Sequence, residues 1–216
     1  MRRSAIAQIS TQTIDGAILV GIVAGLTAVF VTAPSDSPFV FRYGEPSVLT
    51  MWTAAAHHDS VSHLASNATA YALVVGVTYA IYTAQERRTA FWLVVTACLL
   101  LTPLVTTAAD YWLLAVQWDI VAPSTTAQGF SGVVSALVGV LLVTLIGPTT
   151  EWLSCDTAES DAPQRRLLAA GWLVAAVLTV SLLHGGVDVD GRFVNSVAHA
   201  IGLITGGLIA TAVSSI

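Results

Sequence analysis

The sequence predicts an all-α polytopic membrane protein, a six-transmembrane-helix bundle formed by one domain over residues 1–216. Hydrophobic residues make up 55% of the chain and charged residues only 10%, whereas soluble domains carry roughly 25% charged residues. The mean hydropathy is +0.77. Charged residues also leave six long uncharged runs, at 16–35, 60–85, 89–109, 120–150, 167–187 and 193–216. Each run is long enough to span a bilayer, which takes about 20 helical residues.

Each uncharged run gives one expected span. In chain order we expect spans at about 14–33, 60–82, 89–108, 130–147, 167–184 and 193–214. The first run follows Arg2 and Arg3, so a cleaved signal peptide is the alternative for this segment. Its apolar stretch is longer than a signal core, and Pro34 stands where cleavage would occur. We therefore expect a retained helix.

The arginines predict the orientation, because the chain contains no lysine. Six spans place Arg2, Arg3, Arg87, Arg88, Arg165 and Arg166 on one side and leave Arg42 and Arg192 on the other. The positive-inside rule then puts both termini in the cytoplasm of a multi-pass cell-membrane protein. No basic patch or glycine-rich phosphate loop indicates a nucleic-acid partner.

Polar side chains within the spans carry the functional information, since lipid makes them costly unless they face a partner or a wet cavity. His63 and Asn67 are four residues apart and share one face of the second span. Ser131 begins the fourth span, and His199 lies early in the sixth. The second, fourth and sixth spans run in the same direction, so all four side chains are expected near the outer membrane face.

Small residues allow these helices to approach closely. Ser131, Ser135 and Gly139 repeat at every fourth position, as do Gly202 and Gly206 one turn beyond His199. Such stripes are typical of closely packed helices in lipid.

Three motifs resemble the rhomboid family of intramembrane serine proteases. They are HDSVSHLASN at 58–67, GFSG at 129–132 and AHAIGLITG at 198–206. The resemblance implies a catalytic dyad of Ser131 and His199 that cleaves transmembrane helices near the outer face, without a cofactor or metal ion. It also implies an oxyanion hole formed by the Ser131 backbone N–H and the side chains of His63 and Asn67. The supporting residues it implies are His58, Gly129, Gly132, Gly202 and Gly206.

One departure from the family pattern concerns the base. Many rhomboids have an aromatic residue four positions after the nucleophile, which stacks on the catalytic histidine, whereas this chain has Ser135. The sequence leaves open which group orients His199.

Other interpretations of the same residues stay open at this point. Ser131 also suits a helix N-cap, and His63, Asn67 and His199 suit hydrogen bonds between packed helices. His58 suits an exposed position at the membrane interface. The alternative function that fits these interpretations is that of a non-proteolytic protein of the same fold that binds membrane clients.

Two further functional classes are less favoured. A channel or proton-coupled transporter whose histidines relay protons would need an acidic relay partner, and we expect the spans to lack one. A metal enzyme would need co-ligands at a recognisable spacing from His63 and His199. The partners expected are transmembrane protein substrates and membrane lipids.

Overall fold

The computed structural model describes residues 2–33, 37–154, 162–184 and 196–215. It confirms the predicted all-α membrane bundle, with six helices long and apolar enough to cross a bilayer. These helices are α1 (Arg2–Thr32), α3 (Val61–Ala84), α4 (Arg88–Asp110), α5 (Ser131–Ser154), α6 (Ala162–Leu183) and α7 (Ser196–Ser214). The last expected span starts at 193, and residues 193–195, like Arg192, lie outside the described part of the chain.

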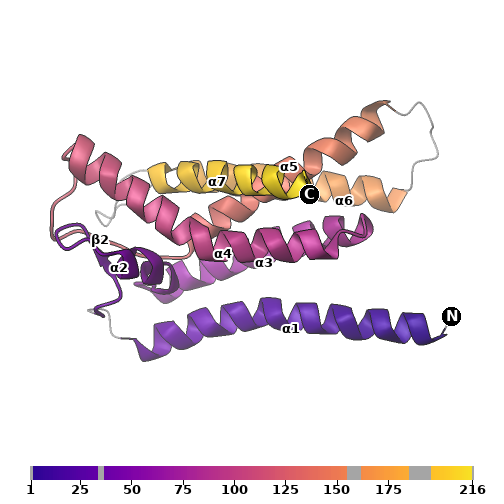
Figure 1. The fold of residues 1–216 in the computed structure, drawn as a ribbon, viewed down its shortest axis with the longest axis horizontal. Helices are drawn as coiled ribbons and strands as arrows, with labels where there is room; N and C mark the ends of the chain where they lie inside the picture. The colour runs from indigo at the N-terminus through magenta and orange to yellow at the C-terminus, as the bar shows by residue number, and fades with distance from the viewer. Residues whose placement is uncertain (1, 34–36, 155–161, 185–195, 216) are drawn as a thin grey trace.

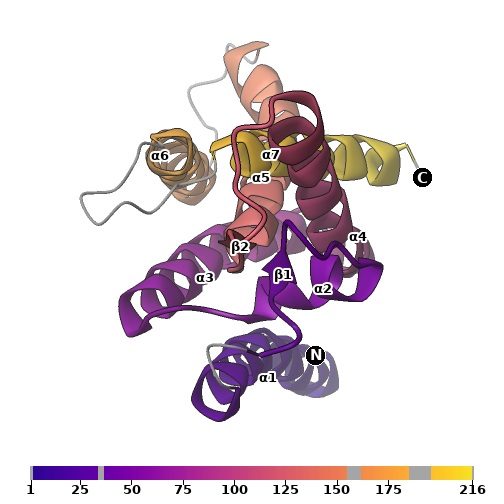
Figure 2. The same ribbon diagram turned by 90° about the vertical axis from the view of Figure 1, so that its left-hand side faces the viewer.

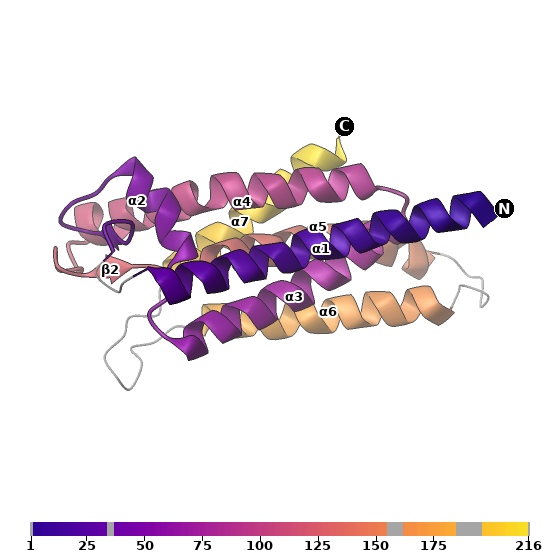
Figure 3. The same cartoon turned by 90° about the horizontal axis from the view of Figure 1, so that it is seen from below.

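Helix α5 is the centre of the bundle, as the end-on view in Figure 2 makes clear. In the most apolar 18-residue stretch of α5, 56% of the residues are buried, whereas the figure is 22% for the corresponding stretch of α6 and 11% for that of α1. Val134, Leu137, Val138 and Leu141 of α5 belong to the main hydrophobic core. Helix α1 lies outside, across the face formed by α3 and α4 (Figures 1 and 3). A residue placed on α5 is therefore held by neighbours on several sides.

Four helices extend well beyond the expected spans, and α1 is one of them, since it begins at Arg2. Helix α4 continues as a π-helix, η2 (Tyr111–Gln117), and α6 begins at Ala162. Helix α5 passes Pro148 and ends at Ser154. The turn after Pro148 is supported from outside the helix ladder, because Trp172 Nε1 of α6 donates a hydrogen bond to Thr149 Oγ1 at 3.0 Å. This contact with α6 holds the turn of α5 after Pro148, which composition assigns to a loop.

The segment between α1 and α3 folds against the entry to α5. Strand β1 (Phe41–Arg42) pairs antiparallel with β2 (Thr126–Ala127), which precedes α5. Helix α2 (Val48–Thr53) and the 3-10 helix η1 (Ala54–Ala56) follow. The Gly129 N–H donates to the Ala54 carbonyl at 3.0 Å. The segment that leads into Ser131 is therefore held by β1 and by η1, at the end of the bundle where Figure 1 places α2 and β2.

The expectation that the spans lack acidic residues is wrong. Asp15 of α1 is fully buried and accepts hydrogen bonds from Arg88 Nε (2.6 Å), Tyr79 Oη (2.7 Å) and Trp92 Nε1 (3.1 Å). Asp110, at the end of α4, is 1% exposed and accepts a hydrogen bond from Tyr43 Oη. Donors brought by other helices and by the first loop make these buried carboxylates tolerable. Asp15 thereby ties the peripheral α1 to α3 and α4.

Candidate active site

The structure brings the expected nucleophile and base together. Ser131 is the first residue of α5, and His199 lies in the first turn of α7. His199 Nε2 and Ser131 Oγ are 2.9 Å apart, within hydrogen-bonding distance. His199 is only 8% exposed.

Close contact between α5 and α7 makes this distance attainable. A Cβ atom added to Gly202 would lie 2.6 Å from the Gly132 carbonyl oxygen and 2.9 Å from Ser135 Cβ. One added to Gly206 would overlap the Ala136 backbone. The expected small-residue stripes therefore face each other, and the helix backbones touch.

A backbone carbonyl of α6 orients the His199 ring. His199 Nδ1 lies 2.6 Å from the Leu182 carbonyl oxygen, which can only accept a hydrogen bond. The ring proton of neutral His199 is therefore assigned to Nδ1, and Nε2 is left free to accept the Ser131 hydroxyl proton. The group that orients His199, which the sequence left open because position 135 is a serine, is therefore the Leu182 carbonyl. Ser135 Oγ donates to the Ser131 carbonyl at 2.8 Å, and Ser135 Cβ packs against Gly202.

The turn before Ser131 needs a glycine. Gly129 has φ = +117°, a conformation that L side chains rarely adopt. A Cβ atom there would also lie 2.7 Å from Cε1 and Nε2 of His63 and 3.6 Å from Asn67 Nδ2. The Nε2 edge of His63 and the amide of Asn67 thus face the turn that carries Ser131. Gly132 is in close contact as well, since its Cβ would lie 3.1 Å from Thr106 Oγ1.

His58 is buried rather than exposed, with 8% of its surface accessible. Its Nε2 lies 3.0 Å from Asn67 Nδ2 and accepts a hydrogen bond from the Phe130 N–H at 3.4 Å. Two donors at Nε2 assign the ring proton to Nδ1. Burial, and to a smaller extent the nearby His63, lower the pKa of His58 from 6.5 to about 4. A neutral His58 thus links Asn67 to the turn before Ser131.

These side chains border a large cleft. Its volume is about 1210 Å³, and it is lined from α3, α4, α5, α6 and α7 and by the segment before α5. Ser131, His199, His63 and Asn67 all line it. Within the described residues, no group of three or more His, Cys, Asp or Glu side chains is arranged to hold a metal ion.

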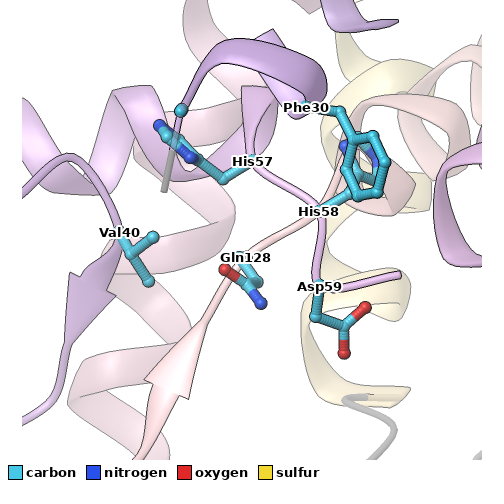
Figure 4. Close-up of a pocket in the computed structure, with 7 residues that line it drawn as sticks. Phe30, Val40, His57, His58, Asp59 and Gln128 are labelled. Atoms are coloured by element: carbon cyan, nitrogen blue, oxygen red, sulfur yellow. The ribbon is translucent and has the colours of Figure 1, made fainter. Parts of the chain in front are cut away.

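A smaller pocket of about 140 Å³ adjoins the cleft. Figure 4 shows Phe30, Val40, His57, His58, Asp59 and Gln128 around it. Asp59 and Gln128 line the cleft as well. At roughly 30 Å³ per water molecule, the pocket has room for a few waters beside His58.

Sequence reasoning missed three groups near the site. The Leu182 carbonyl has no side-chain signal, and the Asp110–Tyr43 pair joins segments far apart in the chain. Asp59 is different, because it lies only four residues before His63, just ahead of α3, so the short spacing of the pair was visible in the sequence. Its Oδ1 is 2.9 Å from His63 Nδ1.

The comparison with protein families agrees with this architecture. A family model described as a rhomboid domain matches residues 45–216. Among curated proteins, none matches the sequence significantly. The family match begins before α2 and includes every helix from α2 to α7. With most of the chain covered, the protein belongs to the rhomboid family.

Proposed function

We propose that this protein is an intramembrane serine endopeptidase that cleaves transmembrane helices with a Ser131–His199 dyad. The observation that carries the proposal is the 2.9 Å contact between Ser131 Oγ and His199 Nε2, within a cleft bounded by apolar helices. Membership of a family that consists mostly of intramembrane serine proteases supports it.

Acyl transfer follows from the hydrogen bonds at the dyad. Ser131 Oγ attacks the scissile carbonyl carbon while His199 Nε2 takes the hydroxyl proton. The Leu182 carbonyl holds Nδ1–H and stabilises the imidazolium that forms. When the tetrahedral intermediate collapses, His199 donates its proton to the leaving amine. Water then hydrolyses the Ser131 ester by the same two steps, which releases the second product.

Donors around the turn before Ser131 stabilise the oxyanion. The Ser131 N–H belongs to the first turn of α5, where helix N–H groups have no partner within the helix. Asn67 has two amide protons, of which one is used by His58, so the other is available to the oxyanion. His63 presents its Nε2 edge to the same turn.

Transmembrane substrates enter between α3 and α6. Ala70 and Leu73 of α3 line the cleft on one side, and Leu178 and Ser181 of α6 line it on the other. Helix α6 is held by a narrow buried stripe of Leu168, Gly171, Ala175 and Leu178, and less of it is buried than of α3. A substrate helix must unwind to expose a carbonyl, and glycine or proline near the cleavage site favours this. Equal cleavage of substrates with and without glycine or proline near the cleavage site would contradict the proposal that the substrate helix unwinds.

The orientation proposed from the arginines puts both termini in the cytoplasm of a cell-membrane protein. A membrane-impermeant thiol reagent applied to intact cells then labels Glu45→Cys but not Gln85→Cys, both in a Cys155→Ser background. If Gln85→Cys were labelled and Glu45→Cys were not, both termini would instead lie outside the cytoplasm.

Serine-directed labelling tests the dyad most directly. Wild-type protein in detergent is expected to react with a fluorophosphonate and to cleave a transmembrane reporter, whereas Ser131→Ala and His199→Ala lose both properties. Ser124→Ala is the control, because Ser124 lines the same cleft outside the dyad. If Ser131→Ala is folded and still cleaves, the dyad is wrong. If wild type binds reporters without cleaving them, the protein is a client-binding member of the family.

A further inference from the structure

The contact between His63 and Asp59 limits which protons His63 can offer. Asp59 Oδ1 lies 2.9 Å from His63 Nδ1, and the two side chains are about equally accessible, at 32% and 29%. A carboxylate is an acceptor only, so this contact places a proton on Nδ1. The Ser60 hydroxyl donates a weaker bond to the same Asp59 oxygen, at 3.3 Å.

A neutral His63 held in this way cannot stabilise an oxyanion. With its single ring proton on Nδ1, Nε2 presents a lone pair to the turn that carries Ser131. The same arrangement makes His199 a base, since Leu182 holds its Nδ1 proton and leaves Nε2 free. An oxyanion hole needs the reverse, a proton on Nε2.

We propose that the working form of His63 is the imidazolium, with one proton bound to Asp59 and the other directed at the oxyanion, and that Asp59 is a positioning residue of the active site. This inference rests on the proposed serine protease function. It assigns the oxyanion hole a full positive charge beside the neutral donors Asn67 and Ser131 N–H.

The groups around His63 are compatible with that charge. The His58 ring lies 5.0 Å away between centroids, and burial keeps it neutral because its pKa is about 4. On α7, His199 is neutral in the resting dyad and becomes charged only as the oxyanion forms. On the cleft wall formed by α4, Asp110 adds a second carboxylate. Asp59 is the acidic group in hydrogen-bond contact with the ring.

This arrangement predicts an alkaline fall in activity that an ordinary serine–histidine dyad does not require. Loss of one proton from this imidazolium removes the Nε2 donor, because Asp59 holds the proton on Nδ1. Loss of one oxyanion-hole donor typically lowers kcat by about 10²-fold. Activity should therefore decline on the alkaline side by up to that factor.

Asp59→Asn separates this mechanism from a purely structural role. The asparagine amide is able to donate to Nδ1, which allows a neutral His63 to carry its proton on Nε2. We expect the variant to lose the alkaline fall and to be about fivefold slower than wild type at lower pH, because a neutral donor replaces a charged one. Asp59→Glu retains the carboxylate and should retain the fall. Glu45→Gln removes an exposed carboxylate of the first loop and should leave the profile unchanged. An identical alkaline fall in wild type and Asp59→Asn would overturn the proposal.

A spectroscopic readout tests His63 without relying on catalysis. In protein labelled with ¹⁵N-histidine, the His63 signals are identified by their loss in His63→Gln. We expect both ring nitrogens of His63 to be protonated under the conditions of full activity. A neutral wild-type ring with its proton on Nε2 would refute the inference. Failure of Ser131 to react with fluorophosphonate would instead refute the protease function, so the two failures are distinguishable.

Discussion

The contact between α5 and α7 allows the dyad geometry to be perturbed by a single methyl group. In Gly202→Ala the new Cβ would lie 2.6 Å from the Gly132 carbonyl oxygen, while an ordinary C···O approach is roughly 3.3 Å. The obstructing atom belongs to the backbone, so the helices must separate by up to about 0.7 Å to relieve the overlap. Gly132 follows Ser131 directly, and Gly202 lies one turn after His199. The displacement therefore acts on the dyad itself.

The expected loss of activity follows from this displacement. If all of it appears at the dyad, the distance of 2.9 Å increases to about 3.6 Å, at which a hydrogen bond is no longer made. Misplacement on this scale costs on the order of 10²-fold in rate. Overpacking should also destabilise the fold by about 1–3 kcal/mol. Adding Ser135→Gly should not restore activity, because the Gly132 carbonyl still obstructs the methyl group.

Cleavage of a transmembrane reporter and the rate of fluorophosphonate labelling, both in detergent, measure the effect. Gly76→Ala is the matched control, since Gly76 is a helical glycine of α3 whose added Cβ meets nothing within 4 Å. The control should keep full activity and gain up to about 1 kcal/mol of stability. Wild-type rates in folded Gly202→Ala would show that helix contact at this point does not set the dyad geometry.

Three further predictions concern groups around the site and the outer helix. Ser135→Phe should inactivate the protein, as measured by labelling, because Ser135 is fully buried against Gly202 and has no room for an aromatic ring; improved activity would contradict this packing. The pKa of His58 is lowered from 6.5 to about 4 in the folded state, so the unfolded chain binds the proton first as pH falls. Stability should therefore decline from about pH 6.5 to about pH 4, with a smaller decline in His58→Gln, as followed by thermal denaturation in detergent; equal declines would refute this assignment. Asp15→Asn should lower the Tm by loosening α1 from Arg88, Tyr79 and Trp92, whereas the neighbouring Gly16→Ala, whose Cβ meets nothing within 4 Å, should not; an unchanged Tm in Asp15→Asn would show that the cluster does not hold α1.

Sequence patterns located the six helices because the hydrophobic effect acts on the composition of each segment. They were less accurate about where helices end. Composition places the end of the third span near residue 108, whereas helical structure continues through η2 to Gln117. Leu114 of η2 packs there with Phe41 and Tyr43 of the first loop, a contact between distant segments that no local pattern contains.

Acidic residues illustrate the same limit. A buried carboxylate is unfavourable when its helix is considered alone, so the expectation was that the spans would lack one. Asp15 is buried because Arg88 and Trp92 of α4 and Tyr79 of α3 reach it. The donors lie more than 60 positions along the chain from Asp15, and only packing brings them together.

The amino-acid sequence alone determined the membrane class, the number of long apolar helices and the residues proposed for the chemistry, because hydropathy and the three motifs depend on residue types at short spacings. The tertiary structure decided which hydrogen-bond partners meet the ring nitrogens of His199 and His63. Leu182 sets the tautomer of His199 from 17 positions away through its backbone carbonyl, a group that every residue possesses and no sequence pattern distinguishes. For His63, the contact with Asp59 depends on the side-chain geometry adopted where α3 begins. Proton positions follow from donor and acceptor atoms meeting in space, and that arrangement exists only once the helices have packed.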